Sequence, residues 1–541
     1  MTREGRAQRA EGRGKAPRAI LRVLLLLLPS ALCALPSHAQ VNAKRAALST
    51  AHPLATRAGL RVLQQGGTAA DAAVTVACVL AVVHPQAGNL GGGGFLVYYD
   101  AKTRDIWTLD FRETAPREVV RGMFDKIPAA GARAAGVPGT VAGLDALHRK
   151  FGKKTWKELL APAIAAAREG PRADAEIAAD IEAAKRERKL DIAKELPSPD
   201  LAATLQRLAE HGASDFYDGQ IAKKLIDGVR ASGGIFGFRD LHEYQPVWRA
   251  PIKLRYGPYE ILTVAPPSGG GIVLGETLNI LAGDDLAALG FQTTASLHLL
   301  VEAQRRAAID RARYVGDPVG ARIPYRELLS QQRAELWRKT IDPKRSLSTS
   351  VLTEPRPATA VEGEHTTHFT IADAAGNIVS FTTSLGENFG SGFLVPELGF
   401  FLNDALTDFT TGANILAAGK RPVSSMTPVI VLRDGKPFLA LGTRGGAAIP
   451  TTILQVFLNV VVYGKSLAAA VAAPRYHHGG LPEEMLYERT LTPQPTIIAL
   501  NEMGHGVAAR ETIGDVHAIL FENGRLIAVA DPRRGGAAGG Y

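Results

Sequence analysis

The sequence predicts an α+β fold of four layers, in which two β-sheets pack face to face and helices cover the outer side of each. Three observations lead to this prediction. Residues 41–350 alternate helical and strand patterns, the chain after residue 366 consists mainly of strand patterns, and helical patterns recur on either side of those strands. A sheet and an amphipathic helix each need another layer on which to bury an apolar face, and such a stack provides it.

The first 39 residues carry the features of a secretory signal peptide. A segment with seven basic residues precedes the apolar run VLLLLLPSALCAL, and the small residues Ser37 and Ala39 follow. This order predicts a signal peptide over residues 1–39 with cleavage after Ala39. The apolar run is too short to favour a stable transmembrane helix. We therefore expect a periplasmic or secreted protein with no stable membrane anchor.

Charge and cysteine content exclude several classes of protein. With residues 1–39 removed, about +4 of the formal net charge of +9 remains, which gives no case for nucleic acid or an anionic membrane as a partner. After that removal Cys78 is the one cysteine left, so it has no partner for an intrachain disulfide. It stands in the apolar stretch AVTVACVLAVV, and we expect a buried structural role.

The helices and strands follow from hydrophobic periodicity and from the positions of glycine and proline. Residues 52–83 predict two helices broken at Gly66 and Gly67. The segment NLGGGGFLVYYD predicts a glycine-rich turn that enters a strand, and the strand IWTLDFR follows. Residues 156–211 are mostly helical in pattern, and residues 297–317 predict an amphipathic helix.

Residues 318–365 lose this regularity and end in PRPATAVEGEH, which indicates an exposed connector. The segments HFTIAD and NIVSFTTSL then flank a turn and predict a β-hairpin. Further strands are expected in PVIVLRDGKPFLALG and VHAILFENGRLIAVA, with helices near residues 450–474 and 493–504.

Two adjacent threonines, Thr366 and Thr367, stand where the connector meets the first strand of this hairpin. Threonine is common in strands, so β-propensity alone would account for them. A threonine at a chain N-terminus, however, carries its own base, because its α-amino group has a pKa of about 7.7–8.0 and can take the hydroxyl proton. The Thr366 hydroxyl could expose that amine by attacking the carbonyl carbon of His365, giving an ester that water hydrolyses. The hypothesis is self-cleavage between His365 and Thr366.

Two further features support this hypothesis. Gly445 and Gly446 separate a strand from a helix start in LGTRGGAAIPTT, where exposed backbone N–H groups could stabilise an oxyanion, although a plain tight turn is the simpler explanation. Ser424 and Ser425 place two hydroxyls just before a strand in KRPVSSMTPVIV, where turn capping is the simpler explanation.

A dozen motifs in order identify the family that the sequence resembles. They are HPLATRAGLRVLQQGGTAADAA, NLGGGGF, LDFRETAP, GVPGTVAG, PPSGGG, EAQRRAAIDRARYVGDP, TTHFTIADAAGN, LNDALTDF, KRPVSSMTP, GTRGG, PRYHH and DPRRGGAAGGY. The sequence resembles the γ-glutamyltransferases, or glutathione hydrolases, of the N-terminal-nucleophile hydrolase superfamily. The resemblance covers essentially the whole chain after the signal peptide and implies the four-layer αββα sandwich of that superfamily.

The resemblance also implies roles for particular residues. Thr366 matches the nucleophile and first residue of the small subunit, and Ser384 matches a hydroxyl that hydrogen-bonds the nucleophile. Gly445 and Gly446 match the oxyanion hole. The substrate's α-carboxylate would be held by Arg112, Ser424 and Ser425, and its α-ammonium by Asp408. A guanidinium suits the first task because it grips a carboxylate with two parallel hydrogen bonds, whereas a surface ion pair with Glu113 or Asp110 is the simpler explanation for Arg112.

The sequence departs from the family pattern at three places. Gly386 stands where many bacterial members have asparagine, and Ala405 stands where many have glutamine. Both of those amides help to fix the amino end of the glutamyl group, so selectivity for γ-glutamyl substrates is in question. The stretch after Asp408, DFTTGANILAAGK, is short and has no aromatic residue after Phe409, so we expect a pocket open to water.

We expect no metal and no cofactor. The spacing of His365 and His368 could suit two metal ligands, as could that of His477 and His478. Residues three apart on a strand, however, face opposite sides of the sheet. The segment NLGGGGF lacks the Lys-Ser/Thr pair of a phosphate-binding loop.

The predicted protein is a self-cleaving hydrolase of γ-glutamyl amides such as glutathione. Its large subunit would span residues 40–365 and its small catalytic subunit residues 366–541, and the two would form a heterodimer that shares one fold. The acyl-enzyme would pass its glutamyl group to water, or to an amino acid or dipeptide. One alternative is an amide acylase of the same superfamily that acts on another dicarboxylic acyl group such as glutaryl. A second is a non-catalytic relative that folds uncut and serves as a binding protein.

Overall fold

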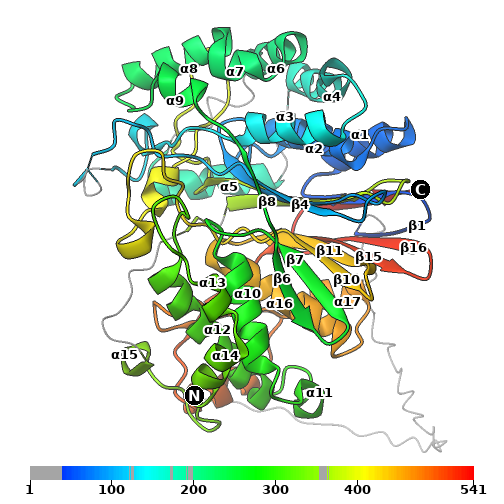
Figure 1. Ribbon diagram of the computed structural model, residues 1–541, viewed down its shortest axis with the longest axis vertical. Coiled ribbons are helices and arrows are strands. Elements are labelled where there is room, and N and C mark those ends of the chain that lie inside the picture. The colour runs from blue at the N-terminus through cyan, green and yellow to red at the C-terminus, as the bar shows by residue number, and fades with distance from the viewer. Residues whose placement is uncertain are drawn as a thin grey trace, which may run out of the picture. The chain divides into compact units, whose positions relative to one another are not determined.

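Two seven-stranded sheets stack on each other at the centre of the fold, and helices cover the outer face of each, as the sequence predicts (Figure 1). This structure is a computed structural model. It describes residues 39–120, 122–123, 127–170, 175–190, 192, 199–352, 362–363 and 365–541. Of the predicted signal peptide, only Ala39 lies within the described residues.

We call the first sheet the β8 sheet, after the strand that begins at the predicted cleavage site. Its order is β17 (Ala537–Gly540), β2 (Ala47–Thr50), β8 (His365–Ala372), β9 (Ile378–Gly386), β3 (Gly93–Tyr99), β4 (Ile106–Asp110) and β5 (Val247–Arg249), with every neighbouring pair antiparallel. Strands from before and after the predicted cleavage site are interleaved in this order, since β2 lies between β17 and β8 and β3 lies next to β9. The two predicted subunits would therefore share one hydrogen-bonded sheet.

The second sheet, which we call the β11 sheet, lies directly beneath the first. Its order is β1 (Gln40–Ala43), β16 (Arg525–Ala530), β15 (Asp515–Glu522), β11 (Lys436–Arg444), β10 (Val429–Arg433), β7 (Tyr259–Thr263) and β6 (Ile252–Tyr256), and all pairs are again antiparallel. Apolar side chains of both sheets, among them Phe95 and Ile378 of the β8 sheet and Leu441 of the β11 sheet, belong to one buried cluster.

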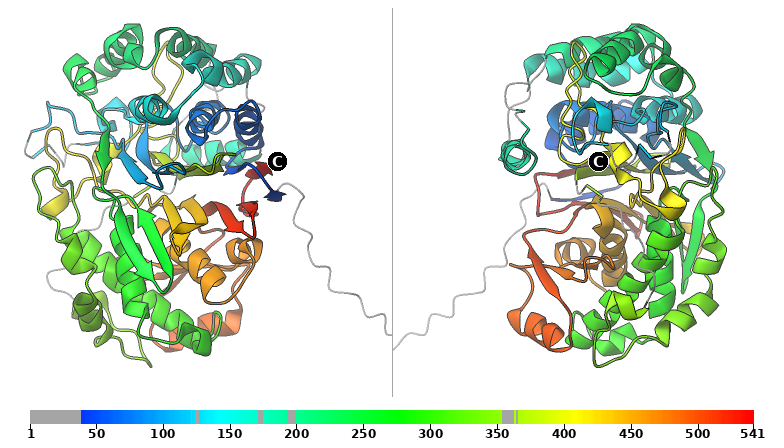
Figure 2. Two further views of the ribbon diagram at one scale, coloured as in Figure 1. Left: turned by 45° about the vertical axis from the view of Figure 1, so that its right-hand side comes forward. Right: turned by 90° about the vertical axis from the view of Figure 1, so that its left-hand side faces the viewer.

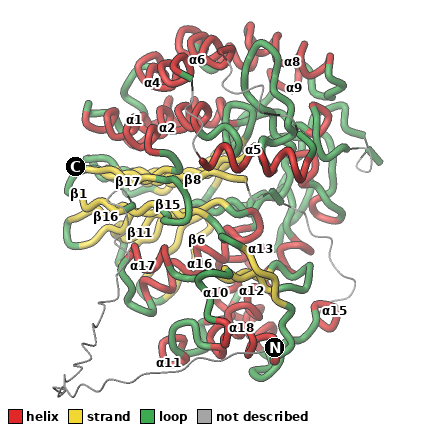
Figure 3. Tube along the Cα trace, turned by 180° about the vertical axis from the view of Figure 1, so that it is seen from behind, coloured by secondary structure: helices red, strands yellow, loops and turns green. Residues whose placement is uncertain are grey.

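Helices from the first half of the chain cover the outer face of the β8 sheet (Figure 1). They are α1 (Pro53–Gln64), α2 (Ala69–Val83), α3 (Thr140–Phe151), α4 (Trp156–Glu169), α6 (Pro199–His211), α7 (Ser214–Asp218), α8 (Gln220–Ala231) and α9 (Phe238–His242). All fifteen residues of α2 are buried. The helix α5 (Ala175–Arg188) instead lies at the level of the sheets, beside the end of β8 (Figure 3).

The outer face of the β11 sheet is covered by helices from the middle and end of the chain, a separation that two further views confirm (Figure 2). They are α10 (Gly270–Leu281), α11 (Leu286–Leu289), α12 (Thr294–Tyr314), α13 (Tyr325–Leu328), α14 (Gln331–Arg338), α15 (Thr349–Leu352), α16 (Ile449–Val461), α17 (Leu467–Ala472) and α18 (Gln494–Glu502). A small sheet of β12 (Tyr476–His478), β13 (Met485–Glu488) and β14 (Val507–Arg510) lies beside them.

The break between α1 and α2 shows how local sequence sets an element boundary. Gly66 adopts a φ of 79°, a left-handed conformation that ends α1. Thr68 then begins α2 with a capping box, because its side chain accepts a hydrogen bond from the backbone N–H of Asp71 while the Asp71 carboxylate accepts one from the backbone N–H of Thr68. The predicted pair of helices is confirmed.

The segment before the predicted cleavage site is less irregular than the sequence predicts. It contains α13, α14 and α15, and α14 packs against α12. The indole of Trp337 donates a hydrogen bond of 2.8 Å to the Asp310 carboxylate on α12, and Ser330 caps the start of α14. A tryptophan contact and a cap thus help to hold a short helix that hydrophobic periodicity does not reveal.

Cys78 is buried within α2. Cys78 is 1% exposed within α2, and burial raises the pKa of its thiol to about 12, which fits the predicted structural role. Among the described helices, none has the length and apolar character needed to cross a membrane.

Candidate active site

Thr366 lies at the start of β8, in the centre of the β8 sheet, and is 2% exposed. A β-bulge falls at this point, since His365 pairs with Gly386 and Thr366 pairs with Ser384, which leaves Leu385 without a partner. Bulges bend a strand and redirect side chains, and they are frequent beside active sites. The predicted cleavage site thus coincides with an irregularity in an otherwise regular hairpin.

Ser384 connects the predicted nucleophile to the bond that it would attack. The Thr366 hydroxyl donates to Ser384 Oγ over 3.2 Å, and Ser384 Oγ donates to the carbonyl oxygen of His365 over 3.2 Å. The backbone N–H of Gly386 donates to the same Ser384 oxygen over 2.9 Å, which orients the hydroxyl. Ser384 is therefore placed to polarise the His365 carbonyl while it holds the Thr366 hydroxyl beside it.

Gly445 and Gly446 form the turn between β11 and the helix α16, with φ values of 129° and 52°. Both values lie in the region that favours glycine. Neither backbone N–H donates a hydrogen bond to another residue in the part of the chain that the structure describes. A Cβ on Gly446 would come within 2.8 Å of the Glu362 carbonyl oxygen, so the turn packs directly against the segment before the cleavage site.

His365 is a weak base in this site. Its Nδ1 accepts a hydrogen bond of 2.9 Å from the Arg444 guanidinium, so that nitrogen is already occupied. Burial, and then the positive charge of Arg444, hold the pKa of His365 well below its usual range. Glu176 of α5 lies 3.4 Å from Arg444, which ties α5 to this end of the site.

Arg112 follows β4 and is 2% exposed, so it is not part of a surface ion pair. Its guanidinium bonds Glu113 over 2.8 Å and also forms an ion pair with Asp408. Burial opposes the charge on Arg112, but these two carboxylates raise its pKa. The residues predicted to hold the two charged ends of an amino acid are therefore in contact with each other in the uncut chain.

The loop that carries Ser424 and Ser425 is held by the glycine-rich motif PPSGGG. The backbone N–H of Gly269 donates to the Ser424 carbonyl over 2.8 Å, and Ser424 Oγ accepts from the Met426 backbone N–H over 3.1 Å. A Cβ on Gly270 would come within 2.7 Å of the Ser425 carbonyl oxygen. Close backbone approach thus accounts for the glycines of that motif.

Gly386 and Ala405, the two departures from the family pattern, lie near a buried carboxylate. A Cβ on Gly386 would come within 1.8 Å of Asp404 Oδ1. Burial raises the pKa of Asp404 to about 7, against the opposing charge of Arg188, whose guanidinium is 3.4 Å away. Asp404 therefore occupies space next to Gly386 that a larger side chain would need.

The short stretch after Asp408 buries its aromatic residue in a small apolar cluster. Phe409 is 1% exposed and belongs to a small apolar cluster with Leu406 and Leu416. The Ala413 carbonyl oxygen also lies close to Gly316, since a Cβ added to Gly316 would come within 2.1 Å of that oxygen. Phe409, the one aromatic residue of this stretch, is thus buried within that apolar cluster.

Sequence reasoning missed two residues that lie in the site. Glu362, four residues before Thr366, contacts Ser425, and Arg311 of α12 contacts Glu362. The signal that could have indicated the pair is an acidic residue at the end of the connector together with an arginine inside the long EAQRRAAIDRARYVGDP motif.

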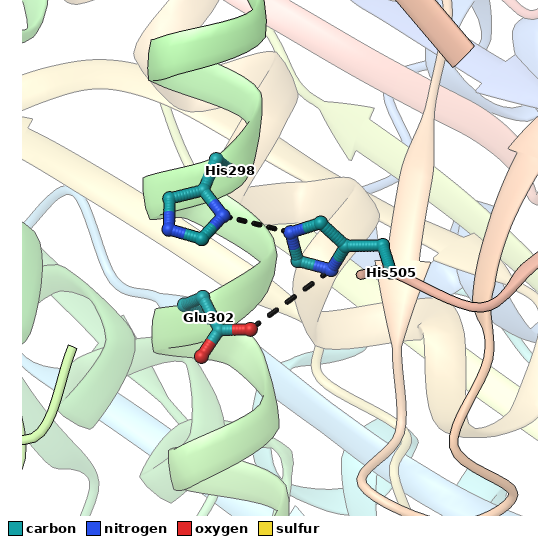
Figure 4. A group of neighbouring side chains, drawn as sticks. All are labelled: His298, Glu302 and His505. Carbon is teal, nitrogen blue, oxygen red and sulfur yellow. Dashed lines mark hydrogen bonds and ion pairs between the residues drawn. The ribbon is translucent and has the colours of Figure 1, made fainter. Parts of the chain in front are cut away.

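His298, Glu302 and His505 form a buried group with metal-ligand chemistry away from this site (Figure 4). The two imidazoles are hydrogen-bonded at 2.7 Å, and Glu302 is already paired with Arg305 and Arg306 at 2.6 Å each. Two adjacent guanidinium groups oppose a further cation, so the group fits a structural network better than a metal site. The absence of a metal from the reaction stays a prediction.

Known proteins are similar to this chain over most of its length. The family model of gamma-glutamyltranspeptidase matches residues 55–541. The chain is 34% identical over 531 residues to the glutathione hydrolase proenzyme of Escherichia coli strain K12, a match that covers 91% of each chain. It is 37% identical over 534 residues to the protein of the same name from Bacillus subtilis strain 168, covering 91% of this chain and 90% of that one.

Among solved structures, the crystal structure of a cephalosporin acylase from Bacillus halodurans is similar, with a TM-score of 0.84, 27% identity, and coverage of 96% of this chain and 99% of that one. This likeness agrees with the predicted αββα sandwich of N-terminal-nucleophile hydrolases. Together, the match over residues 55–541 and relatives at 34% and 37% identity along most of the chain show that it belongs to the γ-glutamyltranspeptidase family, whose enzymes are glutathione hydrolases and γ-glutamyltransferases.

Proposed function

We propose that this chain is a precursor that cuts itself between His365 and Thr366 and then hydrolyses γ-glutamyl amides, glutathione among them. The observation that carries the proposal is the chain of hydrogen bonds from Thr366 Oγ1 through Ser384 Oγ to the His365 carbonyl, at a β-bulge. The similar proteins from Escherichia coli and Bacillus subtilis are named proenzymes, which supports a cut of this kind.

The cut needs no group from outside the chain except water. Thr366 Oγ1 attacks the carbonyl carbon of His365, the bond from that carbon to the Thr366 nitrogen breaks, and the nitrogen takes up the hydroxyl proton to become an amine. The resulting ester is hydrolysed by water, which leaves a carboxylate on His365 and frees the Thr366 hydroxyl. The new amine, with an ordinary pKa of about 7.7–8.0, then serves as the base in turnover.

In turnover Thr366 Oγ1 attacks the γ-carbonyl of the substrate, and the N–H groups of Gly445 and Gly446 stabilise the oxyanion. The amine of the substrate leaves with a proton, and water releases glutamate from the Thr366 ester. At the other end of the glutamyl group, Arg112, Ser424 and Ser425 bind the α-carboxylate and Asp408 binds the α-ammonium. An amino acid carries both charges, so it can replace the direct ion pair of Arg112 with Asp408 without leaving either charge unmatched.

We further propose that residues 1–39 are removed on export, so that the working enzyme is a periplasmic or secreted heterodimer of residues 40–365 and 366–541. Water, an amino acid or a dipeptide would serve as the acceptor, and no cofactor takes part.

The test of this function is a matched pair of variants. Thr366→Ala should remain one inactive chain of residues 40–541, whereas Thr367→Ala should still be cut, because the Thr367 hydroxyl has no hydrogen-bond partner among the described residues. N-terminal sequencing of the small wild-type fragment should read Thr-Thr-His. A small fragment that begins elsewhere, or a Thr366→Ala chain that is still cut, would remove the basis of the mechanism.

A second candidate is an amide acylase that acts on another dicarboxylic acyl group, such as glutaryl. The likeness to a cephalosporin acylase and the presence of Gly386 and Ala405 favour it. Asp408 counts against it, since a glutaryl group has no ammonium to face that carboxylate. Release rates measured with γ-glutamyl, α-glutamyl and glutaryl anilides decide between the two, and a preference for the glutaryl anilide would establish the acylase. An uncut, inactive wild-type chain would instead indicate a binding protein.

A further inference from the structure

The carboxylate of Glu362, four residues before Thr366, is bound at both of its oxygens. The backbone N–H of Ser425 donates to Oε2 over 2.7 Å, and the Ser425 hydroxyl donates to Oε1 over 3.0 Å. Arg311 of α12 forms an ion pair with Oε1. The side chains of Glu362 and Arg311 are 7% and 10% exposed, so this pair is largely withdrawn from water.

The groups around Glu362 are those of the proposed substrate site. Ser425 is one of the residues proposed to hold the α-carboxylate of the substrate. Burial opposes the charge on Arg112, but its pKa is raised by Glu113, by Asp408 and also by Glu362, which shows that the Glu362 carboxylate lies within electrostatic reach of the proposed carboxylate-binding arginine. An acidic side chain of the precursor thus lies where a free carboxylate is expected in turnover.

The backbone next to Glu362 also lies close to residues of the proposed active site. A Cβ on Gly363 would come within 2.2 Å of the Gly386 carbonyl oxygen, and a Cβ on Gly446 would come within 3.1 Å of the Gly363 carbonyl oxygen. The segment therefore passes between the turn of the proposed oxyanion hole and the end of β9. Its downstream end is the His365 carbonyl, which Ser384 contacts.

We propose that Glu362 is a positioning residue for the self-cleavage, and that its carboxylate fills the carboxylate end of the substrate site until the chain is cut. The inference rests on the proposed function, since it takes the cut at Thr366 and the role of Ser425 from there. Arg311 and Ser425 hold Glu362, four residues before Thr366. The bulge holds the chain at Thr366 itself. Fixing both ends keeps the His365 carbonyl beside the Thr366 hydroxyl, and a reaction within one chain gains most from such fixed geometry.

The proposal also implies that the substrate site is closed in the precursor. While Glu362 is in place, the carboxylate of an incoming glutamyl group would meet a negative charge instead of free donors. After the cut, Glu362 is no longer joined to Thr366 through the chain and can leave, which frees Ser425 and Arg311. The same contact therefore promotes the cut and delays substrate binding until the cut is made.

The first test measures the rate of the cut. Purified precursors of the wild type, Glu362→Gln and Glu362→Ala are compared with Glu397→Ala, a control that removes an exposed glutamate paired with Lys224 at 2.9 Å. Glu362→Ala should slow the conversion to two fragments by at least about tenfold. Glu362→Gln should lie between it and the wild type, because the glutamine can still accept from Ser425 but has no charge for Arg311. Conversion of both Glu362 variants at the wild-type rate would overturn the proposal.

The second test asks whether Glu362 blocks a site, which a purely structural role would not do. The probe is L-glutamate, and its binding is measured by calorimetry on uncut Thr366→Ala and on the double variant Glu362→Ala, Thr366→Ala. We expect binding to the double variant and none, or at least tenfold weaker binding, to the single variant. Equal affinity for the two chains would overturn the proposal.

The two tests separate this inference from the proposed function. If the wild type is never cut, or Thr366→Ala is cut, the proposed function fails whatever Glu362 does. If the wild type is cut before Thr366 and the Glu362 variants are cut equally fast, the proposed function stands and only the positioning role is wrong.

Discussion

At the scale of single residues, Arg112 of the proposed substrate site is held by two buried carboxylates in the uncut chain. Its guanidinium lies between the buried carboxylates of Glu113 and Asp408. Removing the whole side chain would leave two buried carboxylates without a counter-charge, a change that costs about 3–5 kcal/mol in comparable sites. An alanine at this position would therefore combine a loss of binding with a loss of stability, and a gentler substitution is needed to test recognition alone.

We predict that Arg112→Lys is still cut before Thr366 but reacts more slowly with γ-glutamyl anilide. Lysine keeps the positive charge but cannot make two parallel hydrogen bonds to a carboxylate, so a loss of about 1.5–3 kcal/mol in kcat/KM is expected, or about 10- to 150-fold. The control is Arg117→Lys, whose side chain is 50% exposed. Unchanged kinetics in Arg112→Lys would show that the carboxylate site lies elsewhere.

Residues also show what the sequence alone could reveal of the site. The family motifs indicate Thr366, Ser384 and the Gly445–Gly446 turn because each is read from local sequence. The contact between Glu362 and Arg311 joins positions 51 residues apart in the chain. No local pattern predicts which distant arginine a carboxylate in a connector will meet, since that depends on how α12 packs beside the Ser425 loop.

At the scale of elements, the end of β9 is the most crowded part of the site. Gly386 has a φ of 97°, and a Cβ there would come within 1.8 Å of Asp404 Oδ1. Both the backbone angle and the neighbouring carboxylate exclude a side chain. The departure from the expected asparagine at this position thus involves the local backbone and is not a simple exchange of one side chain.

We predict that Gly386→Asn accumulates as an uncut and less stable precursor. The substitution would displace Asp404 or distort the bulge that places Ser384 against the His365 carbonyl. Gly435→Asn is a matched control, because Gly435 also has a positive φ of 74° but nothing lies within 4 Å of the added Cβ. The measurement is the melting temperature together with the fraction cut. If Gly386→Asn has the same melting temperature and the same cut fraction as Gly435→Asn, Asp404 does not exclude a side chain at Gly386.

The stretch from Phe409 to Lys420 leads to a prediction about the acceptor. Phe409 is buried in its own apolar cluster, so this stretch has no aromatic ring free to close over the Thr366 ester. Transfer outcompetes hydrolysis only where the acceptor is held and water is excluded. Hydrolysis should therefore dominate, and long γ-linked substrates should be tolerated.

The measurement adds Gly-Gly to a reaction with γ-glutamyl anilide and follows both total release and the transfer product. We expect at most a small rise in total release, with most of the glutamyl group recovered as glutamate. A large rise, with most of the glutamyl group on the dipeptide, would show that another element closes the pocket.

Elements that depend on local signals were predicted well from the sequence. The helix pair α1 and α2, the hairpin of β8 and β9, and the strands β15 and β16 all follow from periodicity and turn residues. The short strands β1, β2 and β17 were not predicted, because four residues carry too little periodicity. They are held by backbone hydrogen bonds to the neighbouring strands.

At the scale of the whole molecule, buried histidines couple stability to pH. Burial lowers the pKa of His505 to about 4, with Glu302 opposing and His298 and Arg305 adding to the effect. The unfolded chain takes up a proton near pH 6.5, whereas the folded chain resists it until about pH 4. His505 therefore contributes stability that is fully present above pH 6.5 and is lost as the pH falls through that window.

We predict that His505→Gln weakens the pH dependence of stability. Between pH 6.5 and 4 the wild type should lose up to about 1.4 kcal/mol per pH unit more than the variant. Denaturant unfolding at several pH values measures the difference, and His211→Gln, at an exposed position of α6, is the control. An identical pH slope in wild type and His505→Gln would show that the His298–His505 pair accepts a proton in the folded state.

The strand β17 sets a limit on when the nucleophile can form. Residues 537–540 pair with β2, which in turn pairs with β8, the strand that begins at the cleavage site. During synthesis β8 leaves the ribosome more than 160 residues before β17. The sheet around Thr366 is therefore incomplete until β17 has been made, and we expect the proposed cut before Thr366 to follow the synthesis of β17. We therefore expect the pairing of β17 with β2 to set the time of the cut.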